Sequence, residues 1–253
     1  MELAELKIDT EFFGAFKKLL SALKDYNKDI DLLTSQKVSV LNESILKKLI
    51  EEGFVVDHKP VETKLITKFT LPETNFEIEF LCPMFGGDPD RKGERQLVKE
   101  IQEGINAQPL RYLDLAQFQP WIVSSESISE LKGLNLDIQI PSPGAYLIQK
   151  FLIRGEISRP PSSIQKDCFY TYELLLKFNK NLKEVYQSLG DIIASKSSKY
   201  TKLRTFKDDF RKYYCDSKSE GIVRIMAELK ARGHNDFVES DVLDAFEDFF
   251  KLF

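Results

Sequence analysis

The chain has 253 residues, and its 36 lysines and arginines against 40 aspartates and glutamates give a formal net charge of -4. This balance excludes a strongly basic nucleic-acid-binding protein, and the length allows a core that folds without disulfides or a structural metal. We expect no membrane association, because no apolar run approaches the ~18 residues of a membrane span and the start lacks a signal-peptide pattern. Three scattered cysteines and two isolated histidines fit neither a disulfide framework nor a zinc site, which indicates a cytoplasmic protein.

The first 115 residues alternate between helix and strand patterns. Apolar residues that recur every three or four positions predict helices, and short alternating runs between turn residues predict strands. A glycine after the second apolar helix is a favourable helix end. The predicted elements are a helix over 12–23, a strand over 28–33, a helix over 44–52, a strand over 54–56, a hairpin formed by 65–70 and 76–81, and a loop over 85–93.

From about residue 141 onward the patterns are helical. Ser142 is a suitable helix N-cap, and Pro143 suits the first helical position. Further helices are predicted near 164–178, 182–194, 200–213, 219–231 and 239–252. We therefore expect an α+β protein in which a small mixed β-sheet with helices, residues 1–115, precedes a mainly helical domain, residues 116–253.

Two acidic pairs lie on predicted strands. Side chains alternate along a strand, so Asp29 and Asp31 share one face, and Glu77 and Glu79 share one face opposite Phe76 and its apolar neighbours. Two carboxylates about 7 Å apart on one strand can converge on a hard divalent cation, which prefers oxygen ligands. If the two strands pair, the glutamates join the aspartates, and such crowded charges repel each other unless a cation neutralises them.

Other interpretations of these acids remain open. Each pair on its own is also typical of a solvated strand face. A metal-dependent nuclease of the PD-(D/E)xK type is a further alternative, but that pattern requires a lysine two residues after the second acid, where this chain has Leu81.

The predicted helix that begins at Pro143 is apolar on nearly all sides, which indicates a buried helix. Lys150 within it must therefore reach water or pair with an anion, because an unpaired buried ammonium is very costly. Tyr146, Lys150 and Arg154 are spaced by four and share a face that suits a phosphate, a carboxylate or solvent. Asp167 is one available partner, and a Lys150–Asp167 salt bridge that joins two helices is the structural alternative.

Several segments taken in order resemble one enzyme superfamily. They are Lys-Asp-Ile-Asp-Leu-Leu at 28–33, Ile-Glu-Phe-Leu-Cys-Pro at 78–83, Pro-Leu-Arg-Tyr-Leu-Asp at 109–114, Ile-Pro-Ser-Pro-Gly-Ala-Tyr-Leu-Ile-Gln-Lys at 140–150 and Lys-Asp at 166–167. Over roughly residues 25–180 this order resembles the nucleotidyltransferase superfamily of the polymerase-β type. The resemblance is closest to bacterial nucleotidyltransferase-like proteins that are distantly similar to the AbiEii toxins.

The resemblance implies a Mg²⁺-dependent enzyme that transfers a nucleoside monophosphate from an NTP to an acceptor hydroxyl, with a cleft between its two domains. Asp29, Asp31 and Glu79 would be the catalytic and metal-binding residues, with Glu77 as a further metal ligand. Lys150, together with Arg154 and Lys166, would contact the triphosphate. The acceptor is open among RNA, a protein and a small molecule.

One departure from the pattern keeps an alternative open. The superfamily places a Gly-Gly or Gly-Ser turn shortly before the two aspartates, where backbone N–H groups bind phosphate. Here only Gly14-Ala15 occurs in that region, and no Gly-Ser pair precedes Asp29. The alternative is a catalytically inactive binding or regulatory module with the same fold.

Overall fold

The computed structural model describes residues 29–33, 44–61, 64–84, 99–127, 132–133, 137–155, 159–234 and 236–253. The helix expected over 12–23 and the loop expected over 85–93 lie outside these residues. The chain divides into two compact units: unit 1 is Met1–Asp114 with Ile122–Gln139, and unit 2 is Leu115–Trp121 with Ile140–Phe253. The stretch Ile122–Gln139, which we expected in the helical domain, thus groups with the sheet-containing unit.

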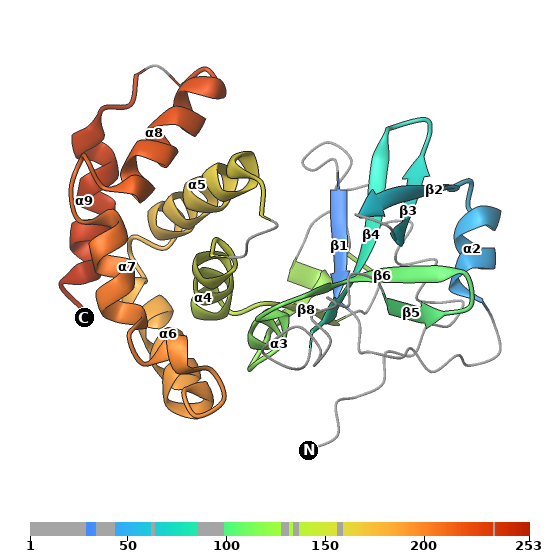
Figure 1. The fold of residues 1–253 in the computed structure, drawn as a ribbon, viewed down its shortest axis with the longest axis horizontal. Coiled ribbons are helices and arrows are strands. Elements are labelled where there is room, and N and C mark those ends of the chain that lie inside the picture. Colours follow the sequence, from blue (N-terminus) through green and yellow to red (C-terminus); the bar gives the residue numbers. More distant parts are fainter. Residues whose placement is uncertain are drawn as a thin grey trace. The chain divides into compact units, whose positions relative to one another are not determined.

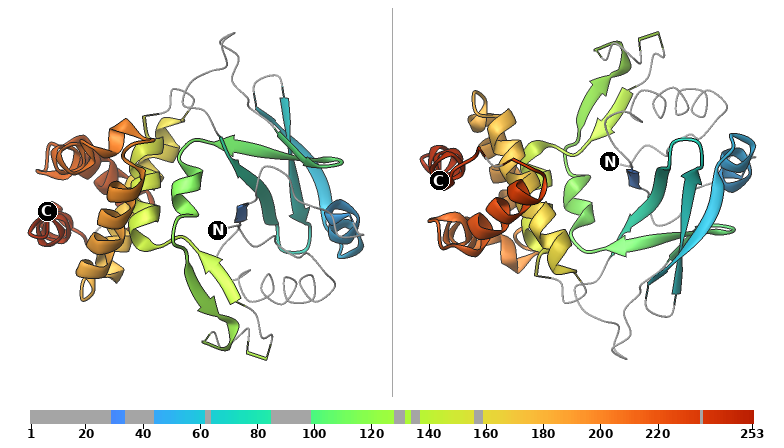
Figure 2. Two further views of the ribbon diagram at one scale, coloured as in Figure 1. Left: turned by 90° about the horizontal axis from the view of Figure 1, so that it is seen from below. Right: turned by 90° about the horizontal axis from the view of Figure 1, so that it is seen from above.

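Unit 1 is built on a six-stranded mixed sheet with the order β2-β3-β4-β6-β5, and β1 pairs with β4 outside this path. β4 is central, because β1 and β6 pair with it in parallel and β3 pairs with it antiparallel. The views of Figure 1 and Figure 2 show these strands as a curled layer. The strands are β1 (Asp29–Leu33), β2 (Val55–Val61), β3 (Lys64–Leu71), β4 (Phe76–Pro83), β5 (Lys99–Gln102) and β6 (Ile105–Leu110).

The helix-capping and turn residues of unit 1 lie where the sequence predicts them. Ser44 caps α2 (Ile45–Glu51) by accepting a hydrogen bond from the backbone N–H of Lys47, and Gly53 after the helix has a φ of 89°. The hairpin of β3 and β4 is confirmed, and Asn75 in its turn has a φ of 53°, a conformation that asparagine tolerates. β2 extends beyond the predicted strand through Pro60, which lacks a backbone donor and is accepted because β2 is an edge strand.

The core of unit 1 lies on one face of β4. Phe76, Ile78 and Phe80 are buried, whereas the glutamates between them are half-buried, so the predicted alternation is confirmed. Ile45 and Leu49 of α2 join the same buried cluster. The apolar face fixes the strand's orientation, because a slip of one residue would bury the glutamates.

Unit 2 is helical, as predicted, and its helices lie side by side in the views of Figure 1 and Figure 2. The helix expected over 200–213 is divided into a 3-10 turn, Thr201–Leu203, and α7. Thr205 precedes α7, and its hydroxyl donates to Asp209 at 2.8 Å, so the polar residues there begin a new helix. The helices are α4 (Pro143–Ile153), α5 (Pro161–Lys177), α6 (Leu182–Lys196), α7 (Phe206–Tyr214), α8 (Glu220–Ala231) and α9 (Glu239–Phe250).

The core of unit 2 is rich in aromatic rings. Phe210 of α7 is fully buried, stacks with Phe206 at a centroid distance of 5.5 Å, and lies 6.2 Å from Phe246 of α9. Tyr214 stacks with Phe246 at 4.4 Å. These rings join α7 to α9 through contacts between residues far apart in the sequence.

The two units are linked by short elements. α3 (Leu113–Ala116) follows β6, and β7 (Trp121–Ser124) pairs with β8 (Asp137–Ile140) in a two-stranded sheet. Within the described residues, no helix has both the length and the apolar character needed to span a bilayer.

Candidate functional site

The register of β1 and β4 brings the two acidic pairs together. The strands run parallel, with Asp29 paired to Glu77 and Asp31 paired to Glu79. The strand pairing on which the predicted carboxylate group depends is therefore confirmed at the level of the backbone. The side chains of Asp29 and Asp31 lie outside the described part of the chain. We call these four positions the acidic block.

The two glutamates of the acidic block occupy the half-buried face of β4. Apolar residues cover the opposite face, so Glu77 and Glu79 are held at fixed positions above the core. Both side chains are half-buried and therefore keep partial contact with water.

Lys68 of β3 is a member of this site that the sequence analysis missed. Its Cα is paired with Glu79 across the hairpin, and its ammonium group forms an ion pair with Glu77. The side chain of Lys68 is 19% exposed and that of Glu77 is 36% exposed. The predicted strand ends, 70 and 76, would place position 68 opposite position 78, and only the observed register places Lys68 opposite Glu79.

The chemistry of the acidic block fits a hard divalent cation. Carboxylate oxygens are the ligands that Mg²⁺ prefers, and the register places four carboxylate residues at neighbouring positions. Glu77 also forms an ion pair with Lys68, so a cation bound at this site would share Glu77 with the lysine. Among the described side chains alone, no three His, Cys, Asp or Glu residues are grouped to hold a metal.

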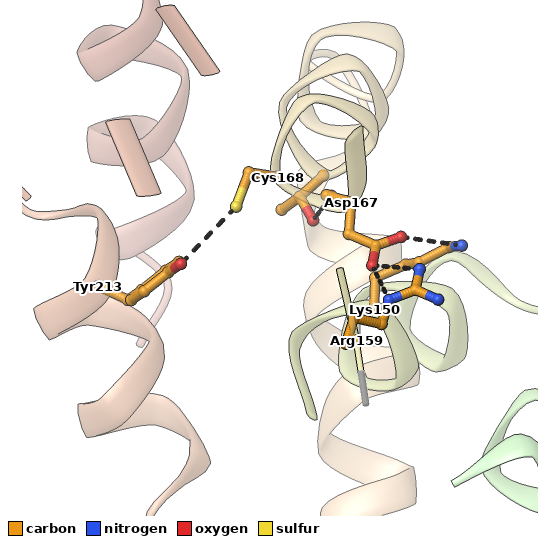
Figure 3. Close-up of polar contacts among 6 residues, drawn as sticks. Lys150, Arg159, Asp167, Cys168 and Tyr213 are labelled. Carbon is orange, nitrogen blue, oxygen red and sulfur yellow. Dashed lines mark hydrogen bonds and ion pairs between the residues drawn. The ribbon is translucent and has the colours of Figure 1, made fainter. Parts of the chain in front are cut away.

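Unit 2 contains a second charged cluster, shown in Figure 3, in which Lys150 and Arg159 converge on Asp167. The ammonium nitrogen of Lys150 lies 3.2 Å from Oδ1 of Asp167. The guanidinium of Arg159 donates to Oδ2, with an Nε–Oδ2 distance of 2.9 Å. The structural alternative for Lys150, a salt bridge to Asp167, is thus confirmed, and its contact with a triphosphate stays a prediction. Sequence reasoning missed Arg159.

The other two predicted phosphate contacts are placed differently. Arg154 lies against aromatic rings, with its guanidinium carbon 3.4 Å from the ring centre of Phe151 and 4.4 Å from that of Tyr213. It also donates to the backbone carbonyl of Phe151. Lys166 is exposed on α5, one residue before Asp167. The roles of Arg154 and Lys166 in phosphate binding stay predictions.

A buried thiol lies beside the charged cluster. Cys168 points away from the Asp167 carboxylate toward Tyr213, and its Sγ lies 3.9 Å from the tyrosine hydroxyl (Figure 3). Burial raises the pKa of the Cys168 thiol above its ordinary value of 9.0. Burial likewise raises the pKa of the Tyr213 and Tyr214 phenols above 10.0, and the nearby thiol adds to the effect. These groups therefore stay neutral and contribute packing rather than nucleophilic chemistry.

This cluster predicts a loss of stability at alkaline pH. Because the folded state binds these protons more tightly than the unfolded chain, the free energy of unfolding falls as pH rises above the unfolded values of 9.0 for the thiol and 10.0 for the phenols. The expected slope is about 1.4 kcal/mol per pH unit for each titrating group. Urea unfolding followed by circular dichroism between about pH 8 and about pH 11 measures it. Tyr213→Phe should reduce the slope, and an equal slope in this variant would contradict the assignment.

Comparison with known proteins identifies the family. No curated protein and no solved structure matches the chain. Residues 23–192 match a family described as nucleotidyltransferase, and this stretch includes both the acidic block and the cluster around Asp167. Since the match covers more than half of the 253 residues, the chain belongs to this nucleotidyltransferase family.

Proposed function

We propose that the protein is a Mg²⁺-dependent nucleotidyltransferase that transfers a nucleoside monophosphate from an NTP to a hydroxyl acceptor. The family supports the general activity. The observation that carries the finer proposal is the parallel register of β1 and β4, which pairs Asp31 with Glu79 and Asp29 with Glu77.

Each acidic residue has a distinct role in this proposal. Asp29, Asp31 and Glu79 would hold the metal ion, with Glu77, which also pairs with Lys68, as a further ligand. Bound Mg²⁺ would neutralise the phosphate charges and stabilise the leaving pyrophosphate. Glu79 also accepts the proton of the acceptor hydroxyl, a role that suits a carboxylate held on a rigid strand. Lys68 limits the repulsion among the four acids and keeps Glu77 in place.

Phosphate binding requires cations, and Lys150 is the candidate for this role. Lys150 contacts the triphosphate in this proposal and keeps its ion pair with Asp167, because an ammonium group has three donor hydrogens. Because no Gly-Ser pair precedes Asp29 in the sequence, side chains carry more of the phosphate binding in this proposal than backbone N–H groups do.

The wild-type protein tests the proposal directly. A ligand present at 100 times its Kd stabilises the folded state by about 2.7 kcal/mol, so MgCl₂ with the preferred NTP is expected to raise the melting temperature by several degrees. Transfer of labelled α-phosphate onto components of a cell extract then identifies the acceptor as RNA, protein or small molecule. A thermal shift without any transfer would favour the inactive binding module, and the absence of both would contradict nucleotide chemistry at this site.

A further inference from the structure

α8 has apolar residues on two opposite sides. Ile222, Ile225 and Leu229 are buried and belong to the core of unit 2. On the other side, Val223 is 52% exposed and Ala227 is also exposed. The outer side of a surface helix normally has polar residues, so apolar residues there indicate a contact surface.

A hollow adjoins the second half of α8. Its volume is about 310 Å³, and its lining combines three apolar side chains with two that can carry a positive charge: Met226, Ala227, Phe237, Lys230 and His234. Single exposed apolar residues are common on protein surfaces. Here an exposed valine near the start of a helix and an apolar hollow near its end occur together, which is a shape that a second copy of the same helix can fit.

The residues on the outer side of α8 are arranged symmetrically. Glu220 and Lys230 each lie five positions from Ile225, and Val223 and Ala227 each lie two positions from it. Because successive residues of an α-helix turn by about 100°, these four positions fall within about 80° of arc, opposite Ile225. We call these four residues the outer face of α8. Their order becomes complementary to itself when a second helix lies against it in the opposite direction.

We propose that the outer face of α8 is the contact surface of a homodimer, in which the α8 helices of two copies pack antiparallel about a twofold axis. Val223 of each copy enters the hollow of the other copy. Glu220 of each copy lies at the level of Lys230 of the other copy. Each contact therefore occurs twice, as a twofold interface requires, and both apolar and charged groups find partners.

The charges on the outer face favour this direction of packing over the parallel one. The acid lies near the start of α8 and the lysine near its end, so antiparallel packing brings opposite charges together and parallel packing brings like charges together. Glu220 can make the contact, because its side chain is 58% exposed. Arg224 donates to its Oε1 through Nε at 2.9 Å and Nη2 at 2.7 Å, so Oε2 can accept from Lys230 of a second copy.

The expected dimer is weak. α8 has 12 residues and is about 18 Å long, so a pair of these helices with their hollows is expected to bury less than a standard interface of about 1,600 Å². We expect a dissociation constant of about 10 to 100 μM. Sedimentation equilibrium of the wild type between about 1 and 500 μM should show the average mass rising from that of one chain toward that of two. A mass of one chain over the whole range would contradict the proposal.

Val223→Asp tests the apolar contact. The new charge would enter the hollow of the other copy, so the variant should dimerise about 10-fold more weakly or worse. Leu176→Asp is the matched control, because Leu176 is an apolar residue of α5 that is 38% exposed and lies outside the lining of the hollow. The control should dimerise as the wild type does. An equal effect of both substitutions, or no effect of Val223→Asp, would show that the outer face is not the interface.

Charge reversal tests the direction of packing. Glu220→Lys and Lys230→Glu each place like charges together twice in a homodimer, so each variant alone should dimerise about 10-fold more weakly or worse. An equal mixture of the two variants pairs opposite charges again and should regain the affinity of the wild type. Failure of the mixture to regain it, with both variants folded by circular dichroism, would contradict antiparallel packing.

Folding does not leave the dimer untested. Glu220→Lys also loses the pair with Arg224, and should this variant fail to fold, Val223→Asp and its control decide alone. The dimer does not depend on the proposed enzymatic activity, because all of these measurements are made without nucleotide.

Discussion

Replacing Asp31 by asparagine is expected to reduce nucleotidyl transfer by about 100- to 1,000-fold, the usual effect of removing one preorganised electrostatic group from an active site. Asparagine keeps the size of the side chain and removes its charge, so the strand pairing with Glu79 is retained. The same variant should lose the thermal shift produced by MgCl₂ with NTP. The measurement is a labelled α-phosphate transfer assay at saturating NTP, with the melting temperature of the free protein as a check on folding.

Two further substitutions sharpen this prediction. Asp57→Asn is the matched control, because Asp57 is an exposed aspartate on β2 of the same sheet, and its activity should equal that of the wild type. Glu79→Gln should approach the effect of Asp31→Asn, because the two residues are proposed metal ligands at paired positions of β1 and β4. Equal activity in Asp31→Asn and the wild type would rule out the acidic block as the catalytic site.

Substituting Gly144 by alanine is expected to lower the free energy of unfolding by about 3 kcal/mol or more, at the upper end of the range for overpacking. A Cβ at this position would clash with the backbone nitrogen of Leu189 and would lie 2.6 Å from Oγ of Ser188. Backbone atoms cannot rotate away, so α4 and α6 would have to separate. The backbone N–H of Gly144 also donates to Ser188 at 3.2 Å, and that contact would be lost. Urea unfolding measures the change.

Gly190 provides the matched control for this experiment. It lies in α6, the helix that contains Leu189, and a Cβ added there meets no atom within 4 Å. Gly190→Ala should therefore stabilise the protein by about 0.5 to 1 kcal/mol, because alanine loses less backbone entropy in a helix. If both variants change stability equally, close packing of α4 on α6 is not what requires glycine at position 144.

Much of the fold could be predicted from local signals. The capped helix α2, the β3–β4 hairpin and most helices of unit 2 occur where periodicity, caps and turn residues predict them. Two observed elements differ from the predicted ones, because their extent depends on the surrounding structure and not on the local sequence pattern alone. β2 includes polar residues and Pro60, which only an edge position permits, and the helix expected over 200–213 is interrupted before Thr205.

The candidate site was predicted in part. Alternation along β4 predicts that Glu77 and Glu79 share a face, and the burial pattern confirms it. Lys68 was missed because its pairing with Glu77 depends on the hairpin register and on the length of its side chain. Arg159 was missed because it precedes a helix, in a segment without periodicity, and only the packing of α4 near α5 brings it to Asp167.

Local sequence patterns are enough to predict the α+β class, the spacing of the acidic pairs and the need of Lys150 for an anion, because these follow from side-chain periodicity and from the cost of burying charge. The parallel pairing of β1 with β4 and the two cations on Asp167 are visible only in the folded chain. Both involve residues distant in the chain, whose meeting depends on how whole elements bury their apolar faces. Which of these distant residues meet is determined by the packing of the whole core, and no single segment encodes it.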